Sequence, residues 1–212
     1  MRHKTTQALY SYWNEVRGGR IAPQRLDIQP ALLGDLLPDT FILERLDAHA
    51  YPFRLAGTRV SIRLGTDLRG ENFLDRWSPS DRDMLRHHLA DITELGRVGI
   101  FTADADFISK RGVCIEIITL PLIHTGTARD RLLCALSVLD DTAGFAIERA
   151  SSMRLLAAEA IWPEGRPQIA PERMANQSPL SPRVRNARIV RQDRRQFRVY
   201  DGGLTKGEGE KL

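Results

Sequence analysis

Apolar residues near the start of the chain recur at intervals of three and four, the spacing that places side chains on one face of a helix. Thr5 or Thr6 can cap this helix, and Gly18 and Gly19 end it, because glycine tolerates the left-handed backbone beyond a helix. Such a stripe packs either on the body of its own subunit or on a partner's helix. The stripe consists of Ala8, Leu9, Tyr12, Trp13 and Val16. The candidates for a dimer interface are Leu9, Tyr12, Trp13 and Val16.

The pattern then changes to short segments that read as strands and helices in alternation. Ser80 is a suitable cap for the longest of these helices, and Gly96 ends it. The predicted elements, in chain order, are a short helix at 27–37, strands at 41–46 and 51–60, helical segments at 61–64 and 80–96, and strands at 99–109, 113–123 and 132–139. The late strands follow one another through short turns, which predicts antiparallel pairing.

The strands predicted at 113–123 and 132–139 are apolar at both alternating sets of positions. In a sheet with one solvent-exposed face, polar and apolar residues would alternate along each strand. We therefore expect this sheet to be covered on both sides. The fold class is therefore α+β. We expect a five-stranded antiparallel sheet with its helices inserted between the second and third strands, preceded by the N-terminal helix.

The end of the chain carries weaker signals. A partial apolar stripe predicts one more helix within 144–160, and the signal fades after Pro163. The predicted organisation has an N-terminal helical extension at 1–34, the main domain at 35–142, a C-terminal helix within 143–164 and a basic, flexible tail at 165–212.

The net charge of +4 over 212 residues is unevenly distributed. Residues 166–212 contain eleven Lys or Arg against five Asp or Glu, so the body before them is slightly negative. The high isoelectric point therefore belongs to the tail and does not mark the whole protein as a nucleic-acid binder.

Targeting and cysteine signals narrow the class of protein further. No apolar run is long enough to span a membrane, and the start MRHKTTQALYSYW lacks the apolar core of a secretory signal. We therefore expect a cytoplasmic protein. Cys114 and Cys134 lie in apolar runs without metal-ligand spacing, which argues against a disulfide scaffold or a zinc site.

Several phrases, in order and spacing, carry a resemblance to a known family. They are YWNEVRGGRIAPQRLDIQP (12–30), LLPDTFIL (36–43), YPFRLAGTRV (51–60), GTDLRGENFLDRW (65–77) and IEIITLPLI (115–123). The chain resembles stand-alone bacterial PAS domain proteins of similar length, known mainly from alphaproteobacteria. The resemblance implies a PAS fold and a non-catalytic regulatory module, used in signalling, motility or cell-cycle control. It brings no shared ligand.

A PAS-like fold would have a pocket between the sheet and its short helices. The candidate wall residues are Phe53, Leu55, Phe73, Trp77, Leu85 and Ile117, with core packing as the alternative reading. Arg54 could hold an anionic ligand with Thr58 as a second donor, or it could pair with a carboxylate such as Glu44 or Glu116.

Cofactor chemistry has little support in the sequence. His88, on the apolar side of the 80–96 helix, is a candidate ligand-binding residue but is more simply a hydrogen-bonded core histidine than a haem ligand. Residues 61–98 contain no cysteine for a flavin photosensor. We interpret Asp104 and Asp106 as solvent-exposed residues on one face of a strand, and not as acid–base groups that act with Glu116. We expect no haem, flavin or metal.

We therefore expect a regulatory PAS module that contacts signalling proteins, forms a homodimer and responds to a small-molecule ligand. Two alternatives stay open. One is a small cone-shaped α+β enzyme of the isomerase or dehydratase type, which needs a titratable pair inside the cavity. The other is a regulator whose basic tail contacts nucleic acid or an anionic surface.

Overall fold

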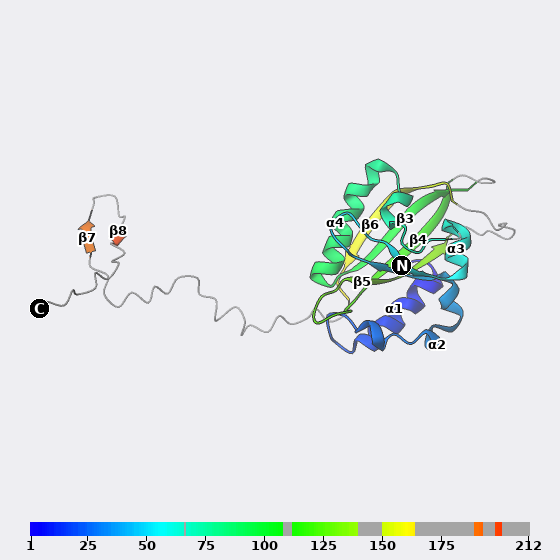
Figure 1. Cartoon of the computed structure of the whole chain (residues 1–212), viewed down its shortest axis with the longest axis horizontal. Coiled ribbons are helices and arrows are strands. Elements are labelled where there is room, and N and C mark those ends of the chain that lie inside the picture. The colour runs from blue at the N-terminus through cyan, green and yellow to red at the C-terminus, as the bar shows by residue number, and fades with distance from the viewer. Residues whose placement is uncertain (66, 108–111, 140–149, 164–188, 193–197, 201–212) are drawn as a thin grey trace, which may run out of the picture. The chain divides into compact units, whose positions relative to one another are not determined.

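A computed structural model of the chain describes residues 1–65, 67–107, 112–139, 150–163, 189–192 and 198–200 (Figure 1). The chain forms two units, Met1–Pro167 and Gln168–Leu212. In the second unit, β7 (Ile189–Gln192) pairs with β8 (Arg198–Tyr200) in an antiparallel ladder. Most of the tail predicted at 165–212, and the start of the helix predicted at 144–160, lie outside the described residues.

The first unit is built on one antiparallel sheet in which the strands lie in the order β2-β1-β5-β4-β3-β6. The strands are β1 (Thr40–Glu44), β2 (Phe53–Ala56), β3 (Val98–Asp106), β4 (Val113–Leu122), β5 (Arg131–Val138) and β6 (Ser152–Ile161). The α+β class, the antiparallel pairing and the insertion of helices after the second strand are confirmed. The sheet has six strands rather than the five expected.

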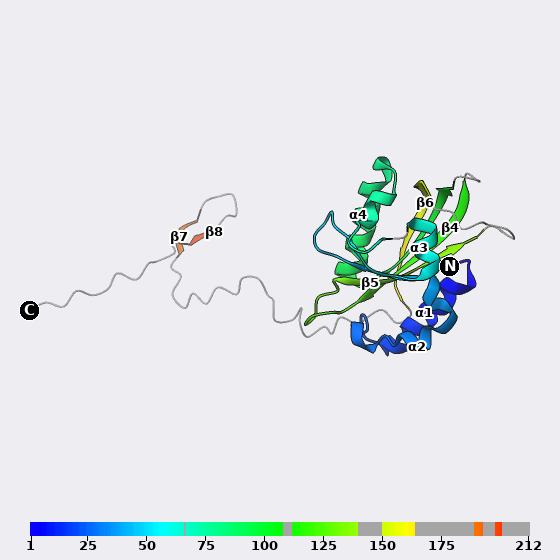
Figure 2. The same cartoon turned by 45° about the vertical axis from the view of Figure 1, so that its right-hand side comes forward.

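Helices lie on both sides of this sheet, with α1 and α2 on one side and α3 and α4 on the other (Figures 1 and 2). The helices are α1 (Lys4–Arg17), α2 (Pro30–Leu33), α3 (Thr58–Leu64) and α4 (Pro79–Leu95), with 3₁₀ turns η1 (Arg25–Asp27), η2 (Gly34–Asp39) and η3 (Phe73–Arg76). Phe101 and Ile117 face the α3–α4 side, whereas Ile118 and Leu133 face the α1 side. The prediction that the sheet is covered on both faces is therefore confirmed.

The sixth strand corrects the helix predicted within 143–164. β6 pairs with β3 from Ser152 opposite Asp106 to Ile161 opposite Val98. The register shifts where Ala157 faces Thr102 and Leu155 faces Ala103, so one extra residue stands in β6. This β-bulge spaces the inward positions two and then three residues apart, and the apolar pattern consequently imitates a helix.

Two other predicted elements are shorter than expected. The strand predicted at 51–60 ends at Ala56, because Gly57 passes against η2 and α3 starts at Thr58. A Cβ at Gly57 would lie 2.3 Å from the Leu37 carbonyl oxygen, which only glycine avoids. The single helix predicted at 27–37 is divided into η1, α2 and η2, and Gly34 stands at the last division with φ +48°.

Candidate functional site

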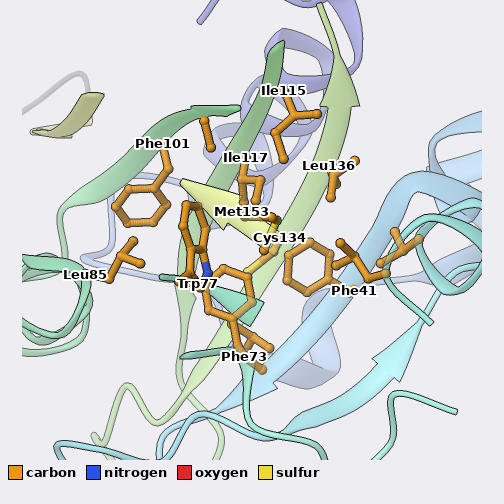
Figure 3. Packing of buried hydrophobic residues seen from close by; sticks show 14 of the residues in the cluster. Phe41, Phe73, Trp77, Leu85, Phe101, Ile115, Ile117, Cys134, Leu136 and Met153 are labelled. Atoms are coloured by element: carbon orange, nitrogen blue, oxygen red, sulfur yellow. The ribbon is translucent and has the colours of Figure 1, made fainter. Parts of the chain in front are cut away.

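An aromatic cluster lies between the sheet and the α3–α4 layer (Figure 3). The ring centroids of Phe41 and Phe53 are 5.4 Å apart, and those of Phe73 and Trp77 are 5.6 Å apart in an edge-to-face arrangement. Such distances are those of rings in direct contact. Five of the predicted pocket residues lie in this cluster and are buried: Phe53, Phe73, Trp77, Leu85 and Ile117.

Leu55 was predicted on the same wall as Phe53, and this is wrong. Ile42 pairs with Leu55 and Leu43 pairs with Phe53, so the register leaves Arg54 as an extra residue in β2. A bulge of this kind turns the following side chain to the other face of the sheet. Leu55 is consequently 55% exposed and lies away from the aromatic cluster.

Three polar atoms inside this layer have no hydrogen-bond partner among the described residues: Tyr51 Oη, Trp77 Nε1 and His88 Nδ1. Tyr51 and Trp77 are almost completely buried, and the His88 ring lies edge-on to Phe101 with centroids 6.2 Å apart. Burial raises the pKa of the Tyr51 hydroxyl, which therefore stays protonated. A buried polar group without a partner is destabilising, so these atoms are the places where a bound molecule would gain most.

Arg54 and Thr58 do not form the predicted anion site. Arg54 donates to the Glu44 carboxylate, which also accepts from Arg131 at 2.5 Å. Thr58 is the first residue of α3 rather than a strand neighbour of Arg54. Of the two readings of Arg54, the ion pair with Glu44 is the one that the structure supports.

The four interface candidates belong to α1, which packs on its own sheet. Leu9 and Trp13 are completely buried, and Trp13 Nε1 donates to the Pro121 carbonyl at 2.9 Å. Tyr12 and Val16 are partly buried against the same cluster. The structure therefore uses this stripe within the chain.

Glu116 contacts the start of α1, and this contact was not predicted from the sequence. Its buried carboxylate accepts hydrogen bonds from the backbone nitrogens of Arg2 (2.7 Å) and His3 (3.0 Å) and from Thr6 Oγ1 (2.5 Å). Burial raises the pKa of this carboxyl, but the hydrogen bonds outweigh burial and leave the pKa below its ordinary value. An ionised carboxylate on β4 thus holds the N-terminal end of α1, where the helix dipole also favours negative charge.

The other acidic candidates have separate partners. Asp104 pairs with Arg154 at 2.9 Å, and Asp106 accepts from the Gly112 nitrogen at 2.9 Å. Within the described residues no cluster of His, Cys, Asp and Glu could hold a metal ion. Nor is any helix of the described chain long and apolar enough to cross a membrane.

A groove of about 440 Å³ lies beside β1 and β2, and Phe41 of the aromatic cluster forms part of its lining. Leu55 and Thr58 line it, together with residues of η1, α2 and η2. Sequence reasoning missed this groove because its walls come from segments that are separate in the chain, and no local motif marks them.

An antiparallel sheet with its helices inserted after the second strand and an aromatic interior beneath them defines a PAS-like α+β module. The family model of the PAS domain matches residues 1–137, which is more than half of the chain. The chain belongs to the PAS domain family and is a sensory and regulatory module. A search of curated proteins found no match.

Proposed function

We propose that this protein is a non-catalytic PAS regulator in bacterial signalling, of the motility or cell-cycle type. It contacts signalling proteins in the cytoplasm and forms a homodimer, and a small molecule in its aromatic interior tunes these contacts. The observation that carries the proposal is the set of three unpartnered polar atoms, Tyr51 Oη, Trp77 Nε1 and His88 Nδ1. A molecule that pairs with them removes a destabilising feature and so favours one packing of helices on the sheet.

Asp104 and Asp106 each interact with a different partner, which supports the non-catalytic part of the proposal. Acid–base catalysis needs titratable groups that act on the same substrate atom. The enzyme alternative would need such a pair in the aromatic interior.

The test is native mass spectrometry of the purified full chain, combined with an absorption spectrum. We expect a bound mass beyond that of the polypeptide, with no haem or flavin bands. Trp77→Phe and His88→Leu should lose that mass, because each removes one interior polar atom. His87→Leu is the matched control, because His87 is an exposed neighbour on α4.

Retention of the bound mass in both interior variants would contradict the proposal, as would its absence from the wild type. A Soret band that disappears in His88→Leu would instead identify a haem protein. The same spectra report the oligomeric state, and a monomer at all concentrations would contradict the homodimer.

A further inference from the structure

The groove beside β1 and β2 is lined mostly by apolar residues. Its apolar side chains come from Ile28 and the α2–η2 segment and from strands β1, β2 and β5. They are Ile28, Pro30, Leu33, Leu37, Pro38, Phe41, Ile42, Leu55, Ala56 and Leu133. Leu37 of η2 and Leu55 of β2 both line the groove and remain 43% and 55% exposed. The groove volume falls in the range of small-molecule sites in proteins.

Arg25 is the single charged residue of this lining. Its backbone nitrogen donates to the Ile123 carbonyl at 2.6 Å, and Ile123 N donates back to the Pro23 carbonyl at 2.9 Å. These two bonds fix the start of η1 to the end of β4. The backbone that carries the Arg25 side chain is therefore anchored to the sheet.

The nearest acidic neighbour in sequence does not neutralise Arg25. Asp27 pairs with Arg20 at 2.8 Å and accepts a hydrogen bond from Gln24 N at 3.0 Å. Among the described residues no acidic group forms an ion pair with Arg25. A cation without a counter-charge beside an apolar groove is complementary to a molecule with one anionic group and an apolar chain.

We propose that this groove binds an amphipathic carboxylate, with the carboxylate on Arg25 and the apolar chain between Leu37 and Leu55. This site is additional to the three unpartnered atoms of the proposed function, because Tyr51, Trp77 and His88 do not line the groove.

Isothermal titration calorimetry of the full chain with decanoate and with decanol tests the proposal. Arg25→Gln should weaken decanoate binding by roughly tenfold or more and change decanol binding by less than about twofold, because only the acid uses the charge. Leu55→Asp should abolish binding of both. Leu55 is half exposed, so this variant keeps its fold, which circular dichroism verifies.

Two further variants serve as controls. Arg69→Gln removes an exposed arginine outside the groove and should leave decanoate binding unchanged. Trp77→Phe alters the aromatic interior and should also leave it unchanged, so failure of this site and failure of the proposed function are distinguishable.

Equal decanoate affinity in the wild type and Arg25→Gln would overturn the proposal. Loss of decanoate binding in Trp77→Phe would also overturn it, by moving the ligand to the aromatic interior. If no decanoate binds and Leu55→Asp converts a dimer into a monomer in sedimentation, the groove is a contact between two copies and the proposal is wrong.

Discussion

Thr6 Oγ1 donates a 2.5 Å hydrogen bond to the buried carboxylate of Glu116 and so joins the first turn of α1 to the middle of β4. The two residues are 110 positions apart in the chain. The backbone nitrogens of Arg2 and His3 complete the contact. The placement of α1 therefore depends on one ionised side chain of the sheet as well as on the apolar burial of Leu9 and Trp13.

Glu116→Gln should lower the free energy of unfolding at neutral pH by roughly 1.5–3 kcal/mol, because it replaces a charged acceptor with an amide. The pKa of Glu116 is lower in the folded state than in the unfolded chain. Its contribution is therefore present above the unfolded pKa and is lost as the pH falls through the folded pKa. Urea unfolding from about pH 7 to about pH 3 measures this loss, and Glu116→Gln should flatten it.

Glu15→Gln is the matched control for this experiment, since Glu15 lies exposed on the same helix. It should leave both the stability and its pH dependence unchanged. An equal pH dependence in the wild type and Glu116→Gln would contradict the assigned role of Glu116.

Trp13→Ala should lower the free energy of unfolding by about 3–5 kcal/mol, because the ring is completely buried and its Nε1 bonds to Pro121. Chemical denaturation measures the change. Ser11→Ala, on the exposed side of α1, should change stability little. A Trp13→Ala variant as stable as the wild type would mean that α1 does not pack on its own sheet.

Gly57→Ala should destabilise the fold by roughly 1–3 kcal/mol, because its new Cβ meets the carbonyl oxygens of Leu37 and Pro38 at 2.3 and 2.4 Å. Both oxygens belong to backbone, so the clash is relieved only by displacement of η2 from β2. Thermal unfolding monitored by circular dichroism tests this expectation. An unchanged melting temperature would show that η2 shifts without loss of stability.

The two cysteines should differ in reactivity. Burial raises the pKa of the Cys134 thiol well above its ordinary value, whereas Cys114 is only partly buried. Because the thiolate is the reactive form, a chromogenic thiol reagent should modify Cys114 in the native protein and Cys134 only after unfolding. Cys114→Ser should therefore remove the fast phase. A fast phase that persists in this variant would show that Cys134 is accessible.

The elements that the sequence predicted well are those with a strong local signal. The stripe around Trp13 and the glycine at its end located α1, and the two-sided apolar pattern of β4 and β5 predicted cover on both faces. These signals depend only on neighbouring residues.

The errors arose where strand pairing decides which side a residue faces. The extra residue at Arg54 places Leu55 on the groove side, and the bulge after Leu155 obscures the alternation of β6. A bulge is visible only when the partner strand is known. The role of Arg25 was missed for a similar reason, because tertiary contacts bring the walls of its groove together.

The edge of the sheet at β6 has a consequence for assembly. Ser78 N donates to the Met153 carbonyl at 3.0 Å, and the Asp81 carboxylate accepts from Leu155 N at 2.9 Å. At this point the outward backbone groups of the edge strand β6 already form hydrogen bonds with the start of α4. A strand from another molecule finds neither donor nor acceptor there, so this stretch resists the edge-to-edge growth that leads to fibrous aggregates.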